Sequence, residues 1–408
     1  MTDRPVTGTR ASTPAETRSI DLLDGQFYVT DPYPTYAWMR EHAPVYWDAT
    51  NELWGVSRYD DIVDVERRKE VFISSDQVKG GYRPNIPADP AMIGLDDPLH
   101  QKRRSLVSRR FTPRAVASRE EHVRRTVVGL FDAVQAKGGS AEVVRDLAAP
   151  LPARTIAWLL GFPEERWPEL ADWSERSIAL GGGPRYTNED GIDAVVEFHT
   201  AAAELYDEKR RCPADDVMSV WTEATIDGQP LDLADVLSDC LLLLDGGAET
   251  TRTVIARTLL LLIDHPDQWR LLRDGADIEV AVEEFIRYVT PIHNMCRVAA
   301  TDTTVGGQPI EKGQQLVLMY SAANRDPAHF ADPERFDVTR QPNNHLSFGF
   351  GTHFCLGAAL ARLELRVFFE ELVRRVRSFR LTPGTEPVEM PNAFVYGLKS
   401  AHLDFQFV

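Results

Sequence analysis

Residues 348–357 read Phe-Gly-Phe-Gly-Thr-His-Phe-Cys-Leu-Gly, and a strongly helical run, Ala-Ala-Leu-Ala-Arg-Leu-Glu-Leu, follows at 358–365. Glycines allow positive φ and let the backbone pass close to a flat ligand. The helix that we expect to begin at about Leu356 directs its free N–H groups and its positive dipole end toward Cys355. A thiol in that setting is shifted toward thiolate, the form that ligates metal. The stretch therefore predicts a metal-ligating cysteine.

The kind of metal site follows from what surrounds Cys355. No second Cys or His stands nearby at CxxC or HxxxH spacing, which disfavours zinc. A single thiolate on a metal indicates haem ligated by cysteine. The alternative is a buried, inert cysteine, the commoner state of a lone intracellular cysteine. The fixed positions of the cysteine-loop signature of the cytochrome P-450 family are all matched, by Phe348, Gly349, Gly351, His353, Cys355 and Gly357. The chain resembles that family over nearly its whole length, which implies haem b with Cys355 as the axial iron ligand.

Composition limits the class of protein. The 408 residues are 43% hydrophobic and 26% charged, as in an ordinary globular protein that is able to bury a sizeable core. A net charge of −17 disfavours nucleic acid and anionic membranes as partners. Without an N-terminal apolar segment or an apolar run near 18 residues, we expect no membrane anchor and no export. The cysteines lie far apart, which suits a reducing cytoplasm; they are Cys212, Cys240, Cys296 and Cys355.

Residues 1–19 are rich in Thr, Ser, Pro and Arg, and we predict a disordered tail there. Residues 20–408 show no regular βαβ alternation and predict one mainly α-helical domain with small peripheral sheets. Short strands are expected at 45–47 and 53–56, forming a hairpin. Helices are expected at 123–134, 152–160, 167–180 and 192–211. The family resemblance implies a triangular helical prism, and we expect a monomer.

Residues 232–264 form the longest helical pattern and are apolar on all sides over much of it, which predicts a central buried helix. Within it, residues 246–251 read Gly-Gly-Ala-Glu-Thr-Thr, although each glycine costs roughly 1 kcal/mol in a helix. The structural interpretation is a close helix–helix contact with a local kink. The functional interpretation is an oxygen-binding notch, which the resemblance favours. In the family, the residue corresponding to Thr250 donates to dioxygen and that corresponding to Glu249 relays protons from solvent.

His100 and Arg104 are four residues apart and share one helix face, a spacing that alone indicates a solvated face. The resemblance implies instead that they bind the haem propionates together with Arg297 and His353. An Arg guanidinium suits a carboxylate of that kind. Phe348, Gly349 and Gly357 complete the residues expected to contact the cofactor.

Glu284 and Arg287 match the Glu-x-x-Arg element of the family, whose role is structural. At i, i+3 spacing the two side chains can pair on one helix face. The expected third partner is Arg335, in a Pro-Glu-Arg-Phe motif, with Arg340 as the alternative. The resemblance implies that this network holds the segment that carries the cysteine loop.

Two classes of function remain open. The first is a haem-thiolate monooxygenase, which takes electrons from NAD(P)H through a separate reductase and ferredoxin, because the chain shows no flavin or ferredoxin domain. A local cluster of Lys102, Arg103, Arg109 and Arg110 on this acidic chain is a candidate docking site for an acidic redox partner. The second is a non-catalytic haem sensor or carrier, which has no need of the Glu249–Thr250 pair. A peroxygenase is disfavoured because specialised members usually lose that pair.

The substrate expectation rests on resemblance within the family. Residues 80–84, 92–93, 144–152 and 294–297 resemble bacterial steroid side-chain hydroxylases, which oxidise the terminal methyl of cholesterol or cholest-4-en-3-one. A departure occurs at 292–293, where a polar histidine enters a position expected to face the pocket. Fatty acids and terpenoids are the alternatives. The expected pocket residues are apolar, with little charge to bind a carboxylate: Met92, Ile93, Ala248, Ile292 and Phe394.

Overall fold

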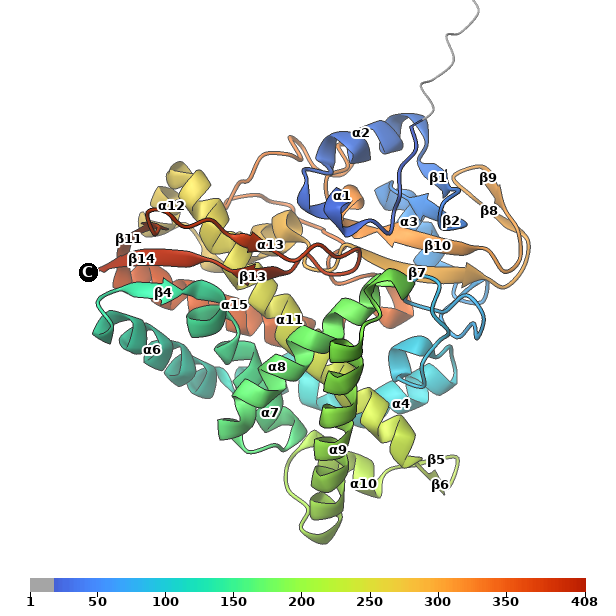
Figure 1. The fold of residues 1–408 in the computed structure, drawn as a ribbon, viewed down its shortest axis with the longest axis horizontal. Helices are drawn as coiled ribbons and strands as arrows, with labels where there is room; N and C mark the ends of the chain where they lie inside the picture. Colours follow the sequence, from blue (N-terminus) through green and yellow to red (C-terminus); the bar gives the residue numbers. More distant parts are fainter. Residues whose placement is uncertain (1–17) are drawn as a thin grey trace, which may run out of the picture.

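The computed structural model describes residues 18–408 (Figure 1). Residues 1–17 of the predicted disordered tail lie outside the described residues. The helices are α1 (Gly25–Val29), α2 (Tyr33–His42), α3 (Tyr59–Arg67), α4 (Leu99–Ser108), α5 (Pro113–Ala117), α6 (Glu120–Ala136), α7 (Pro150–Leu160), α8 (Trp167–Ile178), α9 (Glu189–Arg211), α10 (Val217–Glu223), α11 (Leu233–Asp264), α12 (Pro266–Arg273), α13 (Ile278–Val289), α14 (Tyr320–Ala323) and α15 (Ala358–Arg375).

The strands form small sheets at the periphery, as predicted. The largest sheet has the order β1 (Val45–Asp48), β2 (Leu53–Val56), β10 (Gln315–Met319), β7 (Asn294–Ala299) and β3 (Phe72–Ile73). A three-stranded sheet has the order β11 (Val376–Leu381), β14 (His402–Phe407) and β4 (Ser140–Glu142). The remaining strands form two-stranded pairs: β5 (Thr225–Ile226) with β6 (Gln229–Pro230), β8 (Thr303–Val305) with β9 (Gln308–Ile310), and β12 (Val388–Glu389) with β13 (Leu398–Ser400).

The predicted hairpin is confirmed, and it joins distant parts of the chain. β1 pairs antiparallel with β2 in the register Val45 to Val56. β2 then pairs parallel with β10, so that Leu53 lies opposite Gln315. Figure 1 shows the N-terminal hairpin beside β7 and β10, away from α6, α7 and α10. The sheet therefore carries β7, and with it Arg297, to the edge of the helical part.

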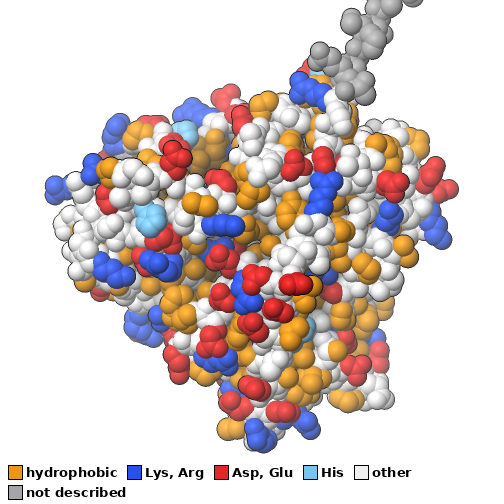
Figure 2. Space-filling model, in the orientation of Figure 1, with side chains coloured by type: hydrophobic (Ala, Val, Ile, Leu, Met, Phe, Trp, Pro, Cys, Tyr) orange, Lys and Arg blue, Asp and Glu red, His pale blue; other side chains and the backbone are white. Residues whose placement is uncertain are grey.

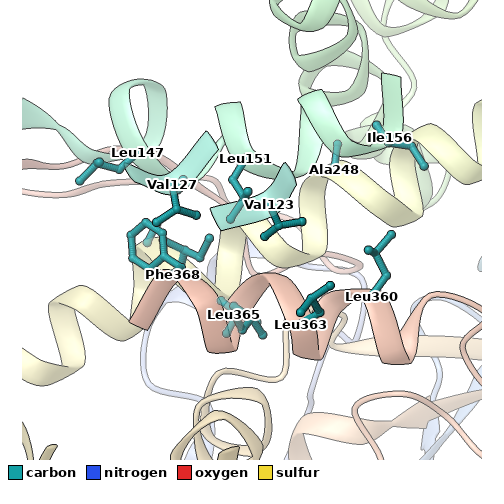
Figure 3. Close-up of a cluster of buried hydrophobic side chains, with 14 of the residues drawn as sticks. Val123, Val127, Leu147, Leu151, Ile156, Ala248, Leu360, Leu363, Leu365 and Phe368 are labelled. Atoms are coloured by element: carbon teal, nitrogen blue, oxygen red, sulfur yellow. The ribbon is translucent and has the colours of Figure 1, made fainter. Parts of the chain in front are cut away.

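The predicted central helix is confirmed as α11, which crosses the middle of the molecule in Figure 1. It packs against α7, α8, α9, α13 and α15. Figure 3 shows how side chains of α6, α7 and α15 meet those of α11 in the largest hydrophobic core. Burial of this apolar surface is the main favourable term for such a helix.

Charges of both signs are interspersed over the face shown in Figure 2. Arg103, which we predicted in a basic surface cluster, is only 2% exposed and pairs with Asp239 at 2.6 Å and Asp235 at 3.1 Å. Lys102 pairs with Asp227 at 2.6 Å. The prediction of a docking cluster is therefore wrong for Arg103, because acidic groups of α11 draw it inward. Within residues 18–408, no helix is both long and apolar enough to cross a membrane.

The ion pair between Glu284 and Arg287 lies on α13 and is fully buried, with 2.7 Å between Nε and Oε2. Arg340 Nε lies 3.1 Å from the same carboxylate, and Asn343 donates to it at 3.1 Å. Arg335, predicted as the third partner, offers its backbone carbonyl to Arg287 and Arg340. Its side chain is 63% exposed, because the turn there directs it to solvent. The prediction of Arg335 is wrong, and Arg340 is the third partner.

This network fixes the segment that leads to Cys355. Arg287 Nη1 donates to the carbonyls of Asn324 and Pro333 at 2.8 and 2.9 Å. The Asn324 side chain in turn accepts from Leu346 N at 2.7 Å and donates to Ser347 Oγ at 2.9 Å. Residues 324–347 are thus tied to α13 at several points immediately before the cysteine loop.

We expect Arg340→Ala to destabilise the protein by about 2 kcal/mol or more, because it removes charged hydrogen bonds from a buried carboxylate. Arg335→Ala is the matched control and should leave the unfolding midpoint unchanged, since an exposed side chain is removed and the carbonyl remains. Thermal unfolding followed by circular dichroism measures both. Equal losses in the two variants would contradict the assignment of Arg340.

Candidate functional site

A cavity of about 620 Å³ lies between α11 and the cysteine loop. Its walls come from the segment before α4, from α4, α8, α9, α11 and β7, and from residues 347–365. It is lined by nearly all the residues predicted for the site, namely Met92, Ile93, His100, Arg104, Thr250, Ile292, Arg297, Phe348, Gly349, His353, Cys355, Gly357 and Phe394. Residues from widely separated parts of the chain thus meet at one place.

The loop that carries Cys355 is shaped by its glycines. Gly349 and Gly351 have φ of +67° and +70°, values that side chains with a Cβ rarely adopt. Cys355 N donates to Phe348 O at 2.9 Å, and the backbone N–H groups of Gly357 and Ala358 point at the thiol. Nevertheless, burial raises the pKa of the Cys355 thiol, and these N–H groups and Arg104 oppose it only in part. Our prediction that the helix N-terminus gives a net shift toward thiolate is therefore wrong, because burial outweighs it; a bound cation deprotonates a coordinating thiol.

The four predicted propionate-binding side chains gather at one edge of the cavity. The rings of His100 and His353 stack with centroids 4.1 Å apart. Burial, together with Arg297, lowers the pKa of His353 to about 2, so this imidazole is neutral. Arg104 donates to the carbonyl of Phe354. Neutral imidazoles and guanidinium groups at one edge form a donor set that suits two carboxylates.

Glu66, on α3, reaches the same edge and was not predicted. Arg297 Nη2 lies 3.4 Å from Glu66 Oε1, and Tyr320 Oη donates to that oxygen at 2.8 Å. Burial raises the pKa of Glu66 to about 7, against the effect of Arg297. Glu66 Oε2 has no hydrogen-bond partner among the described residues. In sequence, Glu66 stands among charged residues and looks like part of a solvated helix face, so no signal marked it.

The opposite wall is the notch in α11. A Cβ added at Gly246 would meet no atom within 4 Å, so its face is open to the cavity. A Cβ at Gly247 would lie 3.0 Å from the side chain of Ile156, so this glycine permits close packing with α7. Thr250 Oγ1 donates to Gly246 O at 2.9 Å. Gly247 therefore permits the close helix–helix contact, and Gly246 opens the face of α11 to the cavity, while the binding of oxygen there stays a prediction.

Glu249 and Ala248 do not line the cavity. Ala248 packs in the core against residues of α7 and α15 (Figure 3), so the prediction that it faces the pocket is wrong. Glu249 is 1% exposed and pairs with Arg252 at 2.8 Å. Arg252 pairs in turn with Glu175 at 2.7 Å, and Glu175 is 45% exposed. Burial raises the pKa of Glu249 to about 7, with Arg252 acting in the opposite direction. This acid thus lies on a charged path from α11 to the surface.

His293 also lies outside the cavity, contrary to the prediction. Its ring stacks on Tyr28 with centroids 4.6 Å apart, and Nδ1 lies 3.0 Å from Ser321 Oγ. Burial lowers the pKa of His293 to about 3, so the ring is neutral. The preceding Ile292 lines the cavity instead, because the chain is extended where Ile292 bridges to Val395 and neighbouring side chains point to opposite sides.

The residues present fit a flat cofactor with two carboxylates. Gly246 and Gly357 leave open space on the two walls, since a Cβ added at either would meet no atom within 4 Å. Cys355 faces the cavity from one wall and Thr250 from the other. The guanidinium and imidazole groups stand at one edge.

Comparison with known proteins decides the family. Residues 278–406 match the sequence profile described as Cytochrome P450. A steroid C26-monooxygenase of Mycobacterium tuberculosis is 38% identical over 396 residues, covering 96% of this chain and 98% of the relative. A linalool 8-monooxygenase of Pseudomonas putida is 34% identical over 401 residues, covering 94% and 98%. A solved structure of a Mycobacterium marinum cytochrome P450 in complex with pseudoionone superposes with a TM-score of 0.86 at 34% identity, covering 96% of this chain and 100% of that one. The chain is a cytochrome P450.

As a P450, the protein is a monooxygenase that carries haem b, and the predicted cofactor and reaction class are confirmed. The non-catalytic sensor or carrier is thereby set aside. Bacterial P450s receive electrons from redox partners, which agrees with the expectation of separate donors. The mainly helical fold predicted from the sequence is the fold of the solved P450 structures.

Proposed function

We propose that this P450 hydroxylates an isoprenoid lipid, with the terminal side-chain methyl of a steroid such as cholesterol or cholest-4-en-3-one as the first candidate. The observation that carries the proposal is the apolar wall formed by Met92, Ile93, Ile292 and Phe394 in the cavity that ends at Cys355. Similarity to a steroid C26-monooxygenase supports it.

A fatty acid fits this cavity less well. The guanidinium of Arg83 lines the cavity but already pairs with Asp89 at 2.8 Å. The guanidiniums of Arg104 and Arg297 stand at the edge assigned to the cofactor. A substrate carboxylate would therefore have to displace Asp89 or lose its hydration without a partner, and both are costly.

A terpenoid alcohol is the second candidate, and a specific observation favours it. Asp245, one residue before the notch, places a carboxyl group in the cavity wall beside Leu241, Leu242 and Leu243. Similarity to a linalool 8-monooxygenase agrees with a small oxygenated isoprenoid.

We assign roles to the residues of the site on the same basis. Haem b, when bound, supplies the reductive activation of dioxygen that leads to insertion of one oxygen atom into a C–H bond. Cys355 would ligate its iron, and His100, Arg104, Arg297 and His353 would hold its propionates. Thr250 would offer to dioxygen the hydroxyl that here donates to the carbonyl of Gly246. Glu249, with a pKa near neutrality, passes protons from the surface toward Thr250.

We further propose the surroundings in which the enzyme works. A ferredoxin and its NAD(P)H-dependent reductase supply the electrons, and the enzyme acts as a monomer. The four cysteines are all free, which fits the reducing conditions of the cytoplasm.

Titrating the ferric enzyme with cholest-4-en-3-one, a terpenoid alcohol and a long-chain fatty acid tests the substrate class. Displacement of water from the haem changes its Soret band, so the band reports binding. We expect the isoprenoids to bind at least about tenfold more tightly than the fatty acid, the factor that corresponds to about 1.4 kcal/mol. Tighter binding of the fatty acid would overturn the proposal.

Thr250→Ala should leave substrate binding and electron uptake nearly intact while diverting turnover to peroxide, because the hydroxyl that directs protons is lost. Glu249→Gln should slow turnover about tenfold or more with less loss of coupling, because it removes a general acid from the path. Thr250→Ser is the matched control that keeps a hydroxyl. The measurement is product and peroxide formed per NADH oxidised. Unchanged coupling in Thr250→Ala would shift the role to Thr251.

A further inference from the structure

The side chain of Asp245 interrupts a leucine-rich face of α11 at the cavity wall. It follows Leu242, Leu243 and Leu244 in the sequence and directly precedes Gly246. Ser177, on α8, donates its hydroxyl to the carboxyl group, at 2.9 Å from Oδ1 and 3.1 Å from Oδ2. A serine hydroxyl has one proton to donate, so it satisfies only part of the bonding capacity of a carboxyl group. Asp245 also lines the cavity, so a group inside it can meet the rest of this capacity.

The charged groups near Asp245 occur in pairs of opposite sign, Arg83 with Asp89 and Glu249 with Arg252. Burial raises the pKa of Asp245 to about 8, the hydroxyls of Ser177 and Ser174 and the guanidinium of Arg83 lower it, and Glu249 raises it. The carboxyl group therefore carries its proton at neutral pH and both donates and accepts. Because Arg83 is paired with Asp89, the cluster offers no free charge to an anion.

We propose that Asp245, with Ser177, is the hydrogen-bonding anchor for a hydroxyl group on an otherwise apolar substrate. The inference rests on the proposed function, since it concerns how the same cavity selects among isoprenoids. A hydroxyl is the group that complements it, because it both accepts the proton of the acid and donates to its other oxygen. A buried polar group without such a partner costs free energy, so the hydrocarbon analogue is disfavoured.

The place of Asp245 on α11 sets where that hydroxyl must lie on the substrate. Asp245 precedes Thr250 by five residues, which is about 7.5 Å along the helix axis. The carboxyl group is therefore offset from Thr250 by about one and a half helical turns along α11, and a small molecule in the cavity can bridge that offset. An acyclic terpenoid alcohol spans that distance. The ring oxygen of a sterol that enters with its side chain first lies well beyond it, so Asp245 would bind the hydroxyl of the smaller alcohol and would leave the binding of a sterol unaffected.

The test uses the haem-loaded enzyme with linalool and with dihydromyrcene, the hydrocarbon that lacks the hydroxyl. Dissociation constants come from the Soret shift. We expect wild type to bind linalool about tenfold or more tightly than dihydromyrcene, the effect of one buried hydrogen bond. Asp245→Leu should reduce the ratio of the two dissociation constants to about one, because only the binding of linalool is weakened. Asp245→Asn keeps a donor and an acceptor and should retain part of the preference for linalool.

Ser238→Ala is the matched control, because Ser238 is a polar residue of the same helix whose hydroxyl already donates to Ala234 O at 2.9 Å. It should leave the ratio unchanged. The inference would be overturned if wild type bound linalool and dihydromyrcene equally well. It would also be overturned if Asp245→Leu still preferred linalool while its unfolding temperature fell, because Asp245 would then only connect α8 to α11. Cholest-4-en-3-one is titrated in parallel. If it binds while linalool and dihydromyrcene bind equally, the inference alone fails; if no isoprenoid binds, the proposed function fails with it.

Discussion

The buried ion pair between Glu284 and Arg287 is the interaction on which the position of Cys355 depends. It holds Arg340 and the backbone of residues 324–335 against α13, and this segment continues into the cysteine loop. Removing two charges from water is expensive, and such a pair is stable only when further hydrogen bonds satisfy both partners. Here the carbonyls of Asn324 and Pro333 accept hydrogen bonds from Arg287 and offset part of the desolvation free energy. These same bonds fix the backbone that leads to Cys355. Specificity of position, more than net stability, is what this network supplies.

Burial dominates the titration of the groups around the cavity. Helix N–H groups do point at the Cys355 thiol, yet desolvation outweighs them and raises its pKa. The same effect raises the pKa of Glu66, Glu249 and Asp245. Each has a different partner, respectively Arg297, Arg252 and Ser177, and so a different role. Acids that are half-protonated or protonated near neutral pH can exchange protons or donate hydrogen bonds, which ionised carboxylates on the surface cannot do.

Much of the fold and of the site could be predicted because local motifs carried them: the glycine-framed cysteine, the long apolar helix and the hairpin of β1 and β2. The errors have a common cause, which is that tertiary packing selects between residues that look equivalent in sequence. Arg335 and Arg340 both lie within seven residues after Pro333. The path of the backbone there directs the side chain of Arg335 to solvent and that of Arg340 to Glu284. α11 is apolar on all sides, so its periodicity could not show that Ala248 faces the core. Glu66 and Asp245 were missed because a charged residue in a helix is usually solvated.

We propose that Cys355 is the thiolate ligand of the haem, which would lie between this cysteine and the notch of α11. The spectrum of the reduced carbon monoxide complex tests it most directly, because thiolate ligation shifts the Soret band to the red. We expect the shifted band in wild type and in Cys212→Ala, which alters an exposed cysteine. The band should be absent from Cys355→Ala, even where that variant retains haem. A Cys355→Ala protein that keeps the red-shifted band would contradict the account.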